Sequence, residues 1–362
     1  MANSDSGAMH GAAEAAPRIA VDAMGGDFGP SVVVPGAIEA ARARNIRLVL
    51  VGDSALIGAE LDAIDASGLA VEVVHSSQVA EMTDKPADVV RRKKDSSIVV
   101  ANRLVKDGAA DGVVSAGHTG ATLACGMFIL GRQPGVDRPA LASIMPTEKL
   151  PIILADVGAN LDAKAFNLFQ FAVMADALAR SVLGYERPRI GLLSIGEEEG
   201  KGTREVLEAY QMLRSSKLNF VGNVEGRDIF KGDTDVVICD GFVGNVCLKL
   251  SEGLAGSMGR ILKRELTSGL LSKVGTMLSM GALRRFKQVI DYAEYGGAPF
   301  LGLTHISIVC HGSSNTKAIK NAVIMAADYA ASRASDAIAT TLAANCDLTR
   351  FTRGKAANCN GA

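Results

Sequence analysis

Polar residues that could hold an anion recur in short glycine-rich segments of the chain. Lys201 lies among glycines in GEEEGKG, and Asn245 lies in DGFVGNV. The lysine ammonium and the asparagine amide can both donate hydrogen bonds to a phosphate oxygen. Structural alternatives stay open for both residues. Lys201 could pair with the glutamates at 197–199, some of which could instead cap the next helix, and Asn245 could cap a helix or complete a turn.

Two further segments, SAGHTGA and HGSSN, have the composition of a phosphate cradle. Glycines let the backbone approach a ligand closely, and the start of a following helix favours negative charge. Because serine and asparagine also cap helices that bind nothing, a structural role is the alternative. The candidate binding residues are Gly117, His118, Thr119, Gly120, His311, Gly312, Ser313, Ser314 and Asn315.

Acidic and amide residues also follow several apolar runs. Asp22, Asp156 and Asp240 occupy such positions and could orient hydrogen-bond donors. Asn160, in ADVGAN, could bind phosphate or complete a turn. The five histidines show no shared metal-binding spacing, so we predict no metal site and no cofactor.

These residues lie in a repeated pattern of an apolar run, a polar turn and often a helical stretch. Apolar runs without alternation are typical of parallel strands buried on both faces, and helical periods cover 165–183, 203–213 and 316–331. We therefore predict an α/β fold with a three-layer α/β/α open, mostly parallel sheet in two lobes, whose polar turns converge on one site. The predicted strands lie within 18–27, 47–54, 111–120, 151–160, 189–202, 235–245 and 305–315.

Composition excludes several classes of protein. With 38 Lys and Arg against 39 Asp and Glu in 362 residues, the chain lacks the basic excess of nucleic-acid-binding proteins. No apolar run is long enough to span a membrane. Residues 1–17 do not resemble a secretory signal and predict a disordered tail. We expect the main domain over 18–335, and the end of a helix with a loose tail over 336–362.

The cysteines predict buried residues in a reducing cytoplasm rather than disulfides or a nucleophile. None is paired as CxxC. Cys310 precedes His311, but neighbours in a strand point to opposite faces, so we do not expect a catalytic dyad. The six cysteines are Cys125, Cys239, Cys247, Cys310, Cys346 and Cys359.

Seven segments in a fixed order give the chain a resemblance to a known family. It resembles the PlsX-type phosphate acyltransferases over roughly 18–335. These enzymes convert acyl-acyl-carrier-protein (acyl-ACP) and inorganic phosphate to acyl phosphate and free ACP, at the start of bacterial phospholipid synthesis. One departure is His118, which stands where the family pattern has asparagine. The segments are VDAMGGDFGP, SAGHTGA, ADVGAN, GEEEGKG, DGFVGNV, YGGAPFLG and HGSSN.

The resemblance implies a fold similar to phosphotransacetylases and to isocitrate and isopropylmalate dehydrogenases. It also implies a homodimer, with glycerol-3-phosphate acyltransferase as the enzyme that acts next. Phosphate would itself attack the thioester, so no serine or cysteine nucleophile is required. Lys201 and Asn245 are then the candidate catalytic donors to the oxyanion, and Asp240 could accept a proton from monoprotonated phosphate.

A basic and apolar segment predicts a surface for partners. Residues 251–290 hold seven basic and two acidic residues, an excess of five positive charges. Apolar residues at helical spacing, interrupted by glycines, predict a helical hairpin that docks acidic ACP and rests its tip on an anionic membrane. The alternative is a core or dimer interface. The candidate contact residues are Arg260, Lys263, Arg264, Leu271, Lys273, Met277, Arg284 and Arg285.

Two other functions are compatible with the same elements. The first is a decarboxylating NAD-dependent dehydrogenase of the same fold, but the sequence shows no carboxylate cluster for Mg²⁺ and no arginine cluster for a hydroxy acid. The second is a non-enzymatic adaptor at the membrane surface, in which the glycine-rich turns are only structural. We therefore favour a cytoplasmic acyltransferase that associates peripherally with the membrane.

Overall fold

A single eleven-stranded sheet forms the centre of the protein. The computed structural model describes residues 16–345, so most of the predicted N-terminal tail, the C-terminal tail, Cys346 and Cys359 lie outside the described residues. The strands are β1 (Arg18–Asp22), β2 (Arg47–Gly52), β3 (Val71–His75), β4 (Gly112–Ser115), β5 (Ala140–Met145), β6 (Ile152–Ala155), β7 (Ile190–Leu193), β8 (Phe220–Val224), β9 (Val236–Ile238), β10 (Ala298–Leu301) and β11 (Ile306–Val309).

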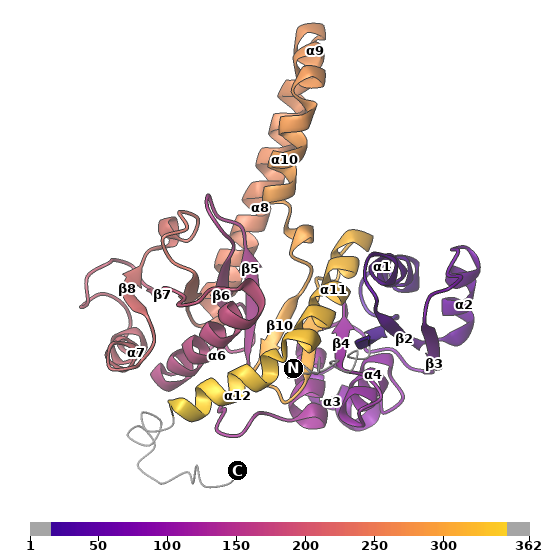
Figure 1. Ribbon diagram of the computed structural model, residues 1–362, viewed down its shortest axis with the longest axis horizontal. Helices are drawn as coiled ribbons and strands as arrows, with labels where there is room; N and C mark the ends of the chain where they lie inside the picture. Colours follow the sequence, from indigo (N-terminus) through magenta and orange to yellow (C-terminus); the bar gives the residue numbers. More distant parts are fainter. Residues whose placement is uncertain (1–15, 346–362) are drawn as a thin grey trace, which may run out of the picture.

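The sheet has two parallel lobes joined by antiparallel strands (Figure 1). Its order is β3-β2-β1-β4-β11-β10-β5-β6-β9-β7-β8. The five strands from β3 to β11, here the first lobe, are mutually parallel, and so are the four from β6 to β8, the second lobe. Strand β10 is antiparallel to β11 and to β5, and β5 is antiparallel to β6. The strands of the two lobes therefore run in opposite directions.

Helices cover both faces of this sheet, as the continuous apolar runs of its strands require. They are α1 (Pro30–Ala43), α2 (Ser54–Asp62), α3 (Pro86–Arg92), α4 (Ser97–Lys106), α5 (Thr119–Cys125), α6 (Ala165–Leu183), α7 (Arg204–Arg214), α8 (Gly241–Leu266), α9 (Leu270–Leu278), α10 (Met280–Ile290), α11 (Thr316–Ser332) and α12 (Ala334–Ala344). A π-helix follows α5 at Gly126–Leu130, and short 3-10 helices cover Gly226–Asp228 and Tyr292–Glu294.

The hydrophobic core is continuous on one face and divided on the other. Because side chains alternate along a strand, Ile19 and Ala20 of β1 point to opposite faces. Ile19 belongs to a cluster that extends across both lobes and includes α1, α6 and α11. Ala20 belongs to a second cluster in the first lobe, and Leu154 of β6 belongs to a third cluster in the second lobe. The lobes thus share one core while each keeps a separate core beneath its other helices.

The predicted α/β fold with a mostly parallel sheet is confirmed. Each of the seven predicted strand segments contains a strand, and the helical periods correspond to α6, α7 and α11. The predicted hairpin differs in its bounds and its parts. Its first helix, α8, begins at Gly241 rather than near residue 251, and a separate short helix, α9, lies between α8 and α10. These helices project from the body, as Figure 1 shows, and we call residues 251–290 the arm.

Candidate active site

Three polar turns meet at the carboxyl ends of β1, β4 and β11. The register pairs Asp22 with Ser115 and Ser115 with Val309, so these strands end side by side. Ser115 Oγ donates to Asp22 Oδ2 at 2.7 Å and accepts from Gly117 N at 3.0 Å. Asp22 is 4% exposed, and burial raises the pKa of its carboxyl against the opposing effect of its hydrogen bonds. A buried carboxyl group thus holds the first predicted cradle in place.

The turns of β1 and β11 are in direct contact. Asp27 N donates to Gly312 O at 2.8 Å. A methyl group at Gly25 would lie 2.8 Å from Gly117 N and 2.9 Å from Asp22 Oδ2, so only glycine allows the turns of β1 and β4 to pack this closely. The predicted SAGHTGA and HGSSN segments therefore belong to one group of turns, together with the turn after β1.

His118 caps the helix that starts at the first cradle. Its Nδ1 accepts from Ala121 N at 3.1 Å, which requires the neutral tautomer with its proton on Nε2. An asparagine side chain could accept the same hydrogen bond. His118 can therefore cap α5 in the way that the asparagine of the family pattern could. Thr119 and Gly120 open α5, so their backbone N–H groups have no acceptor within the helix.

The residues of the HGSSN segment differ in their contacts and their exposure. Asn315 Oδ1 accepts from Ala318 N at 3.0 Å and caps α11, so the structural alternative accounts for this residue. Ser314 is buried, and its N–H donates to His311 O at 3.0 Å. Ser313 is exposed, and its hydroxyl remains a candidate donor to phosphate.

A second group of turns lies in the other lobe, after β6 and β9. Asp156 is fully buried and accepts five hydrogen bonds, from backbone N–H groups and from the amide of Asn160. Asn160 Nδ2 donates to Asp156 Oδ2 at 2.8 Å and to Pro139 O at 2.7 Å. Both amide hydrogens of Asn160 are committed to this turn, which favours its structural role over phosphate binding.

Asp240 and Asn245 both lie at the start of α8, but their side chains make different hydrogen bonds. Asp240 Oδ1 caps the helix by accepting from the N–H groups of Phe242 and Val243, at 2.9 and 3.0 Å. Asn245 is not the cap. Its half-buried amide donates one hydrogen to Val157 O at 3.0 Å, which leaves the second hydrogen for a ligand.

One side-chain pair connects the last turn of the first lobe to α8. His311 Nε2 lies 3.4 Å from Glu252 Oε1. The hydrogen bond to Glu252 raises the pKa of His311, against the opposing effect of burial. The structure thus assembles the predicted turns into two groups bridged by α8. The strands of the two lobes run in opposite directions, so their carboxyl ends lie at opposite ends of the strands of the sheet. This explains why the turns form two groups.

Lys201 lies in the loop between β7 and α7. Its backbone N donates to Glu198 O at 3.0 Å, and its carbonyl accepts from Ser194 Oγ at 2.9 Å. The side chain is exposed, and within residues 16–345 no acidic residue forms an ion pair with it. The glutamates also do not cap α7, because Thr203 Oγ1 accepts from Val206 N at 3.3 Å. The main chain of Lys201 is fixed while its ammonium remains available.

Comparison with known proteins identifies the family. A family model described as "Fatty acid synthesis protein" matches residues 17–336. The chain is 63% identical over 339 residues to the phosphate acyltransferase of Nitratidesulfovibrio vulgaris, covering 93% of this chain and 98% of that protein. The chain belongs to the phosphate acyltransferase family. It is also 56% identical over 335 residues to the phosphate acyltransferase of Lawsonia intracellularis, covering 92% of this chain and 96% of that protein.

The fold is shared with more distant enzymes. A phosphotransacetylase from Streptococcus pyogenes aligns with a TM-score of 0.59 at 18% identity, over 87% of this chain and 94% of that chain. The predicted family, its acyltransferase class and the similarity to phosphotransacetylases are therefore confirmed. Neither the dehydrogenase nor the adaptor alternative gains support from these relatives.

The described cysteines of this phosphate acyltransferase are poor nucleophiles. Burial raises the pKa of Cys125 and of Cys310 to about 12, so both thiols stay protonated near neutral pH. Cys310 is 4% exposed, whereas the neighbouring His311 pairs with Glu252. The two side chains do not form a dyad. Within residues 16–345, no group of three or more His, Cys, Asp or Glu could hold a metal ion.

Some residues of the site could not be identified from sequence. Ser115 begins the SAGHTGA segment, but its bond to Asp22 depends on strand register. In the sequence, Glu252 stands out only as one of the two acidic residues of the predicted hairpin. Its contact with His311 depends on how α8 crosses the second lobe, and no local pattern could have indicated it.

Proposed function

We propose that the two groups of turns and Lys201 carry out the attack of inorganic phosphate on the thioester of acyl-ACP. The observation that carries this proposal is the state of Lys201, whose main chain is fixed by two hydrogen bonds while its exposed ammonium has no acidic partner among the described residues. A preorganised cation beside an acyl group stabilises the negative charge that develops during acyl transfer.

The proposed steps use the donors that the fold leaves unpaired. The N–H groups of Thr119 and Gly120 and the hydroxyl of Ser313 hold phosphate in the first lobe. A phosphate oxygen then forms a bond to the thioester carbonyl carbon, and the carbonyl oxygen becomes an oxyanion. Lys201 and the second amide hydrogen of Asn245, in the other lobe, stabilise this oxyanion, so the proposal requires phosphate and acyl-ACP to meet beside α8, which bridges the two groups of turns. When it collapses, the carbon–sulfur bond breaks, the ACP thiolate leaves and takes up a proton, and acyl phosphate remains.

Phosphate-dependent release of free thiol from palmitoyl-ACP tests this function. We expect one thiol to appear for each acyl phosphate formed, and we expect no release when phosphate is withheld. Reduction of NAD without release of thiol would instead identify a dehydrogenase. A protein that released no thiol and reduced no NAD would be an adaptor, and the proposed catalysis would then be wrong.

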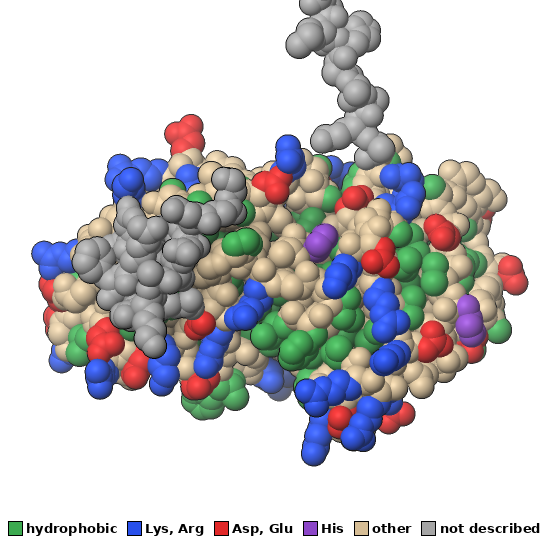
Figure 2. Space-filling model, turned by 90° about the horizontal axis from the view of Figure 1, so that it is seen from below, with side chains coloured by type: hydrophobic (Ala, Val, Ile, Leu, Met, Phe, Trp, Pro, Cys, Tyr) green, Lys and Arg blue, Asp and Glu red, His purple; other side chains and the backbone are tan. Residues whose placement is uncertain are grey.

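We infer that the arm is the surface that meets partners. Leu270 and Leu271 are 84% and 90% exposed, and Met277 and Leu278 are 70% and 82% exposed. Apolar side chains this exposed indicate an interaction surface. The arm also carries the basic excess, whereas the face opposite the arm mixes basic and acidic side chains (Figure 2). The proposed partners are acidic ACP, an anionic membrane and a second copy of the chain, with glycerol-3-phosphate acyltransferase downstream.

Within residues 16–345, no helix combines the length and apolar character needed to cross a bilayer. We propose that the protein works in the cytoplasm and rests the tip of the arm, around α9, on the lipid surface. Basic residues of the arm, such as Arg260 and Arg284, would then face anionic headgroups or ACP.

Charged substitutions at the tip of the arm should abolish binding to vesicles. Leu271→Glu combined with Met277→Glu removes apolar area and adds repulsion from anionic headgroups. We expect the double variant to remain in the supernatant when it is centrifuged with anionic phospholipid vesicles, whereas the wild type sediments with them. The matched control is Leu56→Glu with Met82→Glu, at positions 51% and 65% exposed on the first lobe. Unchanged sedimentation of the arm variant would contradict membrane contact.

A further inference from the structure

Side chains of the second lobe hold the loop that carries Lys201 at several points, and one of these contacts is made by a glutamate of the loop itself. Between β7 and α7, the chain places Glu197, Glu198 and Glu199 immediately before Gly200 and Lys201. Three carboxylates so close to a phosphate-binding lysine would repel phosphate or compete for the ammonium. The contacts of Glu199 show how one of these charges is removed from the site.

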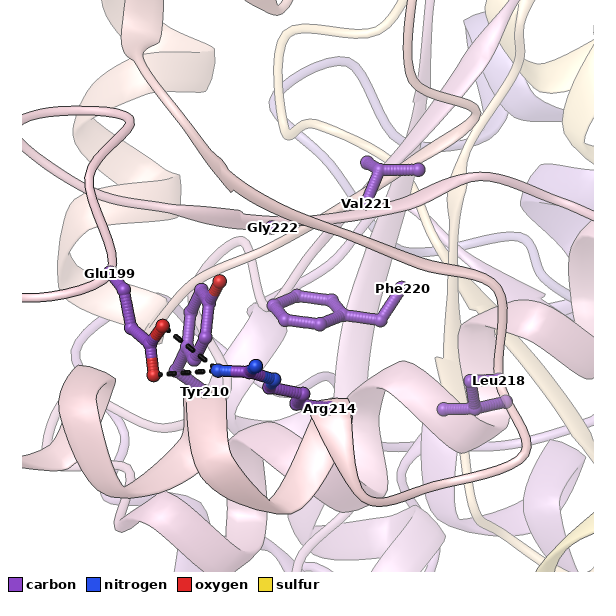
Figure 3. A pocket seen from close by; sticks show the side chains of 7 residues that line it. All are labelled: Glu199, Tyr210, Arg214, Leu218, Phe220, Val221 and Gly222. Atoms are coloured by element: carbon purple, nitrogen blue, oxygen red, sulfur yellow. Dashed lines mark hydrogen bonds and ion pairs between the residues drawn. The ribbon is translucent and has the colours of Figure 1, made fainter.

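Glu199 is held by side chains at the end of α7. Arg214 Nη1 donates to both carboxylate oxygens of Glu199, at 3.0 and 2.9 Å, and Gln211 Nε2 donates to Oε1 at 2.8 Å. Figure 3 shows this ion pair beside Tyr210 and Phe220, among the residues that line a pocket. A guanidinium that contacts both oxygens fixes the direction of the carboxylate as well as its charge.

A second attachment holds the loop from the other side. Asn223 of β8 is 6% exposed, and its Nδ2 donates to Glu198 O at 2.9 Å. The same carbonyl accepts from Lys201 N, so Lys201 is one hydrogen bond away from this buried anchor. The Glu199 side chain and the Glu198 carbonyl therefore hold the loop between α7 and β8.

We propose that Glu199 and Arg214 are positioning residues for Lys201. Their ion pair holds the loop in the shape that presents the ammonium to substrate, and it keeps the Glu199 carboxylate away from that ammonium. This inference rests on the proposed function, because it requires Lys201 to act on the reacting groups. It assigns a role to a pair that touches no substrate.

The pair is suited to this role because it contributes little to global stability. The Arg214 and Glu199 side chains are 62% and 47% exposed, and exposed ion pairs contribute little to the free energy of unfolding. Its loss should therefore leave the protein folded. The effect on catalysis can be larger, because displacing a catalytic group by about 1 Å can lower the rate by about 100-fold.

Arg214→Gln tests the proposal by releasing the Glu199 carboxylate. We expect kcat to fall by about 10-fold and the KM for phosphate to rise several-fold, because Lys201 is displaced and a carboxylate now competes with phosphate for it. Arg214→Lys keeps the charge but replaces the planar guanidinium with a compact ammonium on a flexible stem, so its kcat should lie between those of Arg214→Gln and the wild type. The thermal midpoint should stay near that of the wild type.

A control on the same helix separates positioning from a general effect on α7. Arg204 pairs with Glu208 at 2.7 Å, with side chains 85% and 54% exposed, so this ion pair lies within α7 and does not join it to Glu199. Arg204→Gln should therefore leave kcat and the KM for phosphate unchanged. An equal loss of activity in Arg204→Gln and Arg214→Gln would overturn the proposal.

A double-mutant cycle with Lys201→Ala gives the decisive result. If Arg214 acts through Lys201, then Arg214→Gln should cause no further loss of kcat once Lys201 is alanine. Losses that multiply would show that Arg214 acts independently, and they would overturn the inference. A large loss in Lys201→Ala with wild-type kinetics in Arg214→Gln would refute only the positioning role. Wild-type kinetics in Lys201→Ala would refute the catalytic role of Lys201 itself.

Discussion

Replacing Lys201 with alanine lowers the turnover number by about 100-fold or more. This is the loss expected when one preorganised donor to an oxyanion is removed. The fold supports the expectation because the backbone of Lys201 is hydrogen-bonded to Ser194 and Glu198, while its ammonium is unpaired within the described residues. The measurement is the rate of thiol release from palmitoyl-ACP at saturating phosphate. Since the lysine side chain is exposed, the thermal midpoint should hardly change.

The matched control is Lys217→Ala. Lys217 is an exposed lysine just beyond the other end of α7, and it lies outside both groups of turns. The control removes the same charge and leaves the loop between β7 and α7 intact. We expect its turnover number to equal that of the wild type. Near-wild-type turnover in Lys201→Ala would make Lys201 a surface residue, and Asn245 would then be the remaining candidate donor to the oxyanion.

The strands that sequence predicts and those that it misses differ in their surroundings. The strands β1, β2, β4, β6, β7, β9 and β11 are buried apolar runs that end in polar turns, and each was predicted. The strands β3, β5, β8 and β10 were not. Strands β3 and β8 lie at the two edges of the sheet and are partly exposed, and β10 contains Pro299. Edge and proline-containing strands give little periodic signal. Strand β5 is central and buried, so neither reason applies to it.

Strand direction could not be predicted for a different reason. Whether the lobes run the same way depends on how β10 and β5 pair, and these strands come from segments far apart in the chain. Local patterns carry no information about such pairing. The prediction of turns at strand ends was sound, but convergence on one edge assumed a uniform sheet. The antiparallel strands divide the turns into two groups, which α8 bridges through Glu252 and His311.

For the candidate site, too, local sequence indicated some features, and others depend on residues far apart in the chain. Sequence placed Lys201 in a turn, because glycine and polar residues mark turns, whereas the candidate Asn245 lies inside α8. The sequence could not distinguish residues that cap helices or complete turns from residues whose donors stay available to a ligand. The amide of Asn160 proved to be committed to Asp156, and Asp240 proved to be the cap of α8. Only the positions of all neighbouring donors and acceptors show which groups remain available to a ligand.

Gly244→Ala should destabilise the protein strongly. A methyl group at this position would lie 1.9 Å from Asp156 O and 2.9 Å from Cys239 Sγ. The nearest atom belongs to the buried backbone of the turn after β6, so it cannot move aside as a flexible side chain could. Overpacking of this kind costs about 3 kcal/mol of unfolding free energy. Urea denaturation measures the loss as a lower midpoint.

The same substitution should also abolish thiol release, because relief of the clash requires α8 to move away from the turn. Asn245 is the next residue, and its contact with Val157 O would be lost together with the position of its free hydrogen. Gly253→Ala is the control on the same helix. No atom lies within 4 Å of its added methyl group, so we expect a gain of about 0.5–1 kcal/mol and unchanged activity. Equal stability of the two variants would show that α8 does not pack rigidly on the Asp156 turn, and the proposed placement of Asn245 would then lose its support.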